Sequence, residues 1–60
     1  MTTLERVARA TSYIRLVKDD LEQAAKESQS GIAILILQKA IRELYLMETR
    51  LNNFEIEAQK

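Results

Sequence analysis

Ser28-Gln29-Ser30-Gly31 is the only turn-like cluster in this sequence of 60 residues, and it decides the fold. Glycine can adopt the left-handed conformation that ends many helices, and serine is favoured as the residue that caps the start of one. We therefore expect one helix to end here, with Gly31 left-handed, and a second helix to begin, with Ser28 or Ser30 as its cap. The chain holds one Gly and no Pro in all, so the usual punctuation of β-rich folds is missing.

An apolar stripe with helical spacing lies on each side of this turn. The first stripe consists of Val7, Ala10, Ile14, Val17, Leu21 and Ala24. The second consists of Ala33, Leu37, Ala40, Leu44, Met47, Leu51, Phe54 and Ala58. Alternating steps of three and four residues are typical of a heptad seam on one face of a helix, as in coiled coils. Thr2 and Glu5 have the spacing of a capping box at the start of the first helix. The sequence therefore predicts a single domain with a helix over about 3–28, a turn over about 28–31 and a helix over about 32–58.

The phase of the two stripes favours a hairpin over one continuous helix. Ser28 continues the first stripe and Leu37 belongs to the second, so at about 100° per residue a single rod would turn the two seams to opposite sides. Folding the chain back lets the seams face each other, and it brings Lys18 within reach of Glu48. We predict an all-α fold, an antiparallel two-helix hairpin, with both seams as its core.

The run Ile32–Leu37 offers a competing local interpretation. It is apolar and rich in β-branched residues, so in isolation it could form a buried strand. No second strand-like segment exists to pair with it, and an unpaired strand leaves its backbone groups unsatisfied. A helix is the better prediction for this run.

The small size of the chain predicts a partner. A chain of this length buries only about 60% of its unfolded surface, and without Cys or His it can use neither a disulfide nor a His-containing metal site. The second helix also carries more apolar surface than the first can cover. We expect the partner to contact Ile34, Leu35, Ile41, Tyr45 and Leu46. A homodimer forming a four-helix bundle is the simplest closed solution, and another helical protein on the same face would satisfy the physics equally well.

The composition also excludes several classes of function. No Gly-rich phosphate loop, Cys or His is present, so we predict no enzyme, no catalytic, cofactor-binding or metal-binding residues, and no small-molecule substrate. The apolar run Ile32–Leu37 is far too short for a membrane span, and the N-terminus lacks the pattern of a signal peptide, so we expect a cytoplasmic protein that binds no membrane.

The predicted function is a small protein–protein interaction module, such as a regulator, adaptor or chaperone-like subunit, acting through an apolar helix face. A dimeric hairpin of this length resembles, in shape alone, the small plasmid copy-number regulator Rop. That resemblance implies RNA binding as the alternative function. The cations that could then contact nucleic acid are Arg9, Arg15, Lys39 and Arg42. The zero net charge argues against neutralisation of phosphate as the main task.

Overall fold

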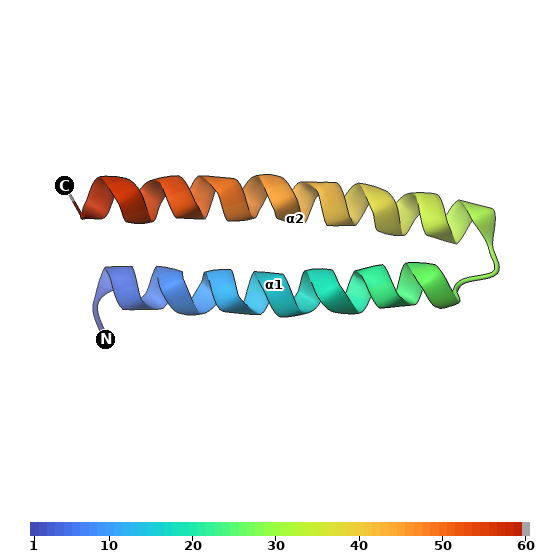
Figure 1. The fold of residues 1–60 in the computed structure, drawn as a ribbon, viewed down its shortest axis with the longest axis horizontal. Coiled ribbons are helices and arrows are strands. Elements are labelled where there is room, and N and C mark those ends of the chain that lie inside the picture. Colours follow the sequence, from blue (N-terminus) through green and yellow to red (C-terminus); the bar gives the residue numbers. More distant parts are fainter. Residues whose placement is uncertain (60) are drawn as a thin grey trace.

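Two antiparallel helices joined by a short turn make up the computed structural model, which describes residues 1–59 (Figure 1). Helix α1 spans Thr3–Glu27 and helix α2 spans Gly31–Ala58. The start of α1 and the end of α2 lie at the same end of the hairpin, opposite the turn. The predicted all-helical hairpin is confirmed. The run Ile32–Leu37 belongs to the first turns of α2, and no residue among 1–59 is in a strand.

Helix α1 begins with the predicted capping box. The Thr2 hydroxyl accepts a hydrogen bond of 3.1 Å from the backbone N–H of Glu5, and the Glu5 carboxylate accepts one of 3.2 Å from the backbone N–H of Thr2. These bonds satisfy backbone amides that have no partner within the helix. The capping box therefore fixes where α1 starts.

The turn differs from the prediction in its use of glycine. Ser28 and Ser30 are extended, with φ/ψ of −72°/138° and −94°/121°, and the Ser30 hydroxyl caps α2 by accepting a 3.2 Å hydrogen bond from the N–H of Ala33. Gly31 is the first residue of α2 and does not have a positive φ. The expected left-handed Gly31 is therefore wrong, because two extended serines around Gln29 reverse the chain without it.

Replacing Gly31 by alanine should stabilise the protein. A Cβ atom at this position meets nothing within 4 Å, and alanine is the better helix former. We expect the free energy of unfolding to rise by about 0.5 kcal/mol, partly because the unfolded chain loses freedom. Urea unfolding followed by circular dichroism measures this change. Ser30→Ala, which removes the adjacent cap, is the control and should cost about 1 kcal/mol. A loss of stability in Gly31→Ala would show that the turn needs glycine.

The hairpin has no closed apolar core. Within residues 1–59 no apolar side chain is fully buried, and the two buried residues are polar, Thr11 and Lys18. The molecule measures 46 × 18 × 11 Å and its radius of gyration is 14.1 Å. A compact domain of this length would have a radius of gyration of about 10 Å. The protein is thus a single layer of two helices.

The helices are rotated relative to the predicted packing. On α1, Thr11 and Lys18 are buried in the contact with α2, whereas Val17 of the predicted seam is 48% exposed. On α2, Met47 and Phe54 are 46% and 40% exposed. The expectation that the whole of both seams forms the intramolecular core is therefore wrong, because one flank of each seam is turned out of the hairpin. Thr11 tolerates burial because its hydroxyl donates a 2.9 Å hydrogen bond to the carbonyl oxygen of Val7.

Candidate protein interface

One face of the hairpin is polar and internally paired. Lys18 Nζ lies 3.6 Å from Glu48 Oε2 and 3.9 Å from the centre of the Tyr45 ring. Arg15 Nε lies 3.2 Å from the same Glu48 oxygen. The Tyr45 hydroxyl donates a hydrogen bond of 3.4 Å to Glu22. We call these five residues the ion-pair face, and the predicted approach of Lys18 to Glu48 is confirmed.

The opposite face of the layer is apolar. Val17 follows Arg15 by two residues on α1, and Met47 follows Tyr45 by two residues on α2. Two residues at about 100° each turn the helix by about 200°, so their side chains point about 160° apart. Val17 and Met47 therefore both point away from the ion-pair face, to the same side of the layer.

Positions seven or eleven residues away extend this apolar side along both helices. Ala10 shares the stripe of Val17, and Ile36 and Phe54 share that of Met47. Ile36 is 64% exposed. We call this surface the apolar face. Its exposed apolar members are Ala10, Val17, Ile36, Met47 and Phe54, and the exposed side chains of Arg6, Tyr13 and Glu43 stand at its border.

The accessible area of the hairpin is larger than that of a compact protein. The chain exposes 4837 Å² for a mass of 6.9 kDa. Compact monomers of this mass expose about 4,000 Å². The difference of about 800 Å² is close to the area that one partner loses in a standard protein–protein interface. The hairpin therefore leaves about as much additional surface in water as one partner buries in such an interface.

The five predicted interface residues do not form one exposed patch. Ile34 and Ile41 are half-buried, whereas Leu35, Tyr45 and Leu46 are 66%, 50% and 60% exposed. Tyr45 and Leu46 line an open hollow of α2 together with Arg42 and Thr49. Leu35, Lys39, Arg42 and Leu46 lie on the side of α2 away from α1, which we call the outer edge of α2. Two of the predicted residues thus lie inward and three remain accessible to a partner.

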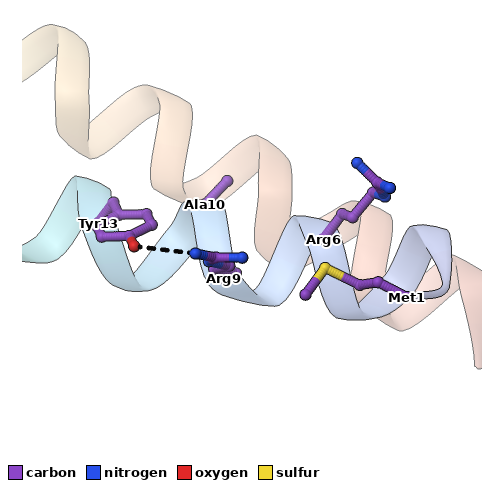
Figure 2. A pocket seen from close by; sticks show the side chains of 5 residues that line it. All are labelled: Met1, Arg6, Arg9, Ala10 and Tyr13. Carbon is purple, nitrogen blue, oxygen red and sulfur yellow. Dashed lines mark hydrogen bonds between the residues drawn. The ribbon is translucent and has the colours of Figure 1, made fainter.

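The predicted nucleic-acid contacts are spread over the molecule. Arg9 donates a hydrogen bond of 3.5 Å to the Tyr13 hydroxyl, and its guanidinium lies 5.8 Å from the centre of that ring. Figure 2 shows this pair beside a hollow lined by Met1, Arg6 and Ala10. Arg15 is paired with Glu48 on the ion-pair face. Lys39 and Arg42 lie on the outer edge of α2, so the structure does not gather these four cations onto one surface.

The residues that sequence reasoning missed are Val17, Met47 and Phe54, which it assigned to the interior. The pattern of apolar residues gave no signal for this, because two charged residues, Lys18 on α1 and Glu48 on α2, occupy places in the helix contact that an apolar residue would otherwise fill.

No group of three or more potential metal-ligating side chains is found within residues 1–59. In the same part of the chain, neither helix has a segment both long and apolar enough to cross a membrane. Comparison with protein-family models, with curated proteins and with solved structures finds no match to this chain.

Proposed function

We propose that this chain is a small protein–protein interaction module, not an enzyme, whose apolar face packs against a second helical layer to complete a four-helix bundle. The observation that carries the proposal is the absence of a fully buried apolar side chain within residues 1–59, beside an apolar face that is open to solvent. A layer of helices is stable when its apolar side is covered by another layer. Binding of a partner supplies that second layer.

The division of the hairpin into two unlike faces supports this role. The ion-pair face already satisfies its charges between α1 and α2, so these charges need no partner molecule. The apolar face consists of aliphatic, thioether and aromatic side chains, which gain most from removal from water. A regulator, adaptor or chaperone-like subunit of this kind would act by covering an apolar surface of its partner.

Light scattering of the purified chain tests the proposal. We expect a mass about twice 6.9 kDa at micromolar or higher concentration. We also expect a melting temperature that rises with protein concentration, because association stabilises the folded state by mass action. A chain that stays monomeric and equally well folded over this range would contradict the four-helix bundle.

RNA binding stays the alternative, without comparable support from the geometry. It requires a continuous basic surface, and Arg15 is paired with Glu48 while Arg9 and Arg42 lie on different helices. Titration with RNA at increasing salt tests it: an affinity that falls steeply with salt would indicate phosphate contacts.

A further inference from the structure

We infer that the second layer is another copy of this chain, related to the first by a two-fold axis parallel to the helices, so that the two turns lie at the same end of the bundle. This inference rests on the proposed function and specifies its partner and its geometry. Two arrangements stack a pair of hairpins by their apolar faces with two-fold symmetry. An axis parallel to the helices places α1 of each copy over α2 of the other. An axis across the helices places α1 over α1 and α2 over α2, with the turns at opposite ends.

Side-chain size distinguishes these arrangements. Along its central stripe the apolar face is small on α1, with Ala10 and Val17, and large on α2, with Ile36, Met47 and Phe54; the one large exposed side chain of α1 on this side, Tyr13, stands at the outer border of the face, beside Ala10. Stacking like helices would set small residues against small ones over α1 and large against large over α2. That leaves a void on one side and crowding on the other, and both are unfavourable in a packed interior. The parallel axis sets a small stripe against a large one on both sides.

The match between the small stripe of α1 and the large stripe of α2 also identifies the partner as a second copy. A two-fold interface must be self-complementary, since the same patch is used by both molecules. The apolar face meets this condition because its small half and its large half fit each other after rotation. The excess exposed area of about 800 Å² also matches one half of a standard interface.

The heights of the side chains along the bundle agree with this arrangement. Rotation about a parallel axis leaves each residue at its own height, so α1 meets the second copy's α2 at the level where it meets its own. Lys18 and Arg15 reach Tyr45 and Glu48 within one hairpin. Val17 therefore stands level with Met47 of the second copy. Ala10, two turns further from the hairpin turn, stands level with Phe54.

Spin labels at the turn test this geometry. The chain has no cysteine, so Gln29→Cys, which lies in the exposed turn, gives a single labelling site. The inferred arrangement predicts a distance between labels of about 10–20 Å, set by the spacing of packed helices. Turns at opposite ends would give a distance near the 46 Å length of the hairpin. That result would overturn the inferred axis but leave the proposed function standing, whereas absence of dipolar coupling with a monomeric mass would remove both.

Cross-linking gives an independent readout. A mixture of Val17→Cys and Met47→Cys chains should oxidise mainly to the mixed 17–47 disulfide, with little product from Val17→Cys alone. A mixture of Leu35→Cys and Leu46→Cys chains, on the outer edge of α2, is the control and should stay largely uncross-linked. Predominance of the 17–17 product would overturn the inferred arrangement.

Discussion

Replacing Val17 and Met47 together by glutamate should dissociate the proposed dimer into a species of 6.9 kDa. Both side chains are about half-exposed in the hairpin, at 48% and 46%, so the change spares most of the contact between α1 and α2. In the bundle, each copy would bury two carboxylates without partners. We expect a cost of at least about 4 kcal/mol, which weakens association roughly a thousandfold. Light scattering over a range of concentrations measures the effect.

The matched control places the same two charges on the outer edge of α2. Leu35→Glu with Leu46→Glu changes the net charge equally, at positions that are 66% and 60% exposed. The mass of this variant should equal that of the unchanged chain. If it becomes monomeric while the Val17/Met47 variant stays associated, the interface includes the outer edge of α2, as the sequence alone predicted, and the apolar face has another role.

Lys18→Glu should largely unfold the hairpin. The Lys18 and Glu48 side chains are only 11% and 17% exposed, so the substitution sets two acids together in a partly dry contact. It also removes the cation that lies 3.9 Å from the centre of the Tyr45 ring. Disruption of a buried pair costs about 3–5 kcal/mol, a large part of the stability of a small domain. Loss of helical circular dichroism and a lower urea midpoint are the expected signals.

Two further variants separate the contributions of Lys18. Lys26→Glu makes the same change of charge at an exposed position of α1 and should cost less than about 1 kcal/mol. Lys18→Met keeps an unbranched apolar stem and leaves Glu48 paired with Arg15, so most of the stability should remain. Equal stability of Lys18→Glu and Lys26→Glu would show that Lys18 is not held against Glu48.

The architecture could be predicted from the sequence because it depends on local chemistry. The serines of the turn, the Thr2–Glu5 capping box and the half-turn offset between the seams each act over a few residues, and together they allow little besides a hairpin. The approach of Lys18 to Glu48 followed from the antiparallel register. Gly31 was misjudged because backbone conformation at a turn depends on both flanking residues, and here the extended serines reverse the chain.

The rotation of each helix could not be predicted in the same way. An apolar seam reports the mean direction of everything that a helix buries, and it does not separate the neighbour in the same chain from a partner molecule. Lys18 lies in the contact because its long stem packs between the helices while its ammonium group reaches Glu48 and Tyr45. Val17 and Met47 were therefore assigned to the hairpin contact, although the structure turns them outward.

A slab only 11 Å thick leaves every side chain within one residue's depth of water. In the proposed dimer the second copy supplies the interior that one hairpin lacks, so dilution would act on the protein as a denaturant does on larger proteins. The amount of chain that a cell makes would then set both how much of it is folded and how much of it is paired. A low concentration alone would favour the unfolded chain, which proteases can cleave, without any separate signal for degradation.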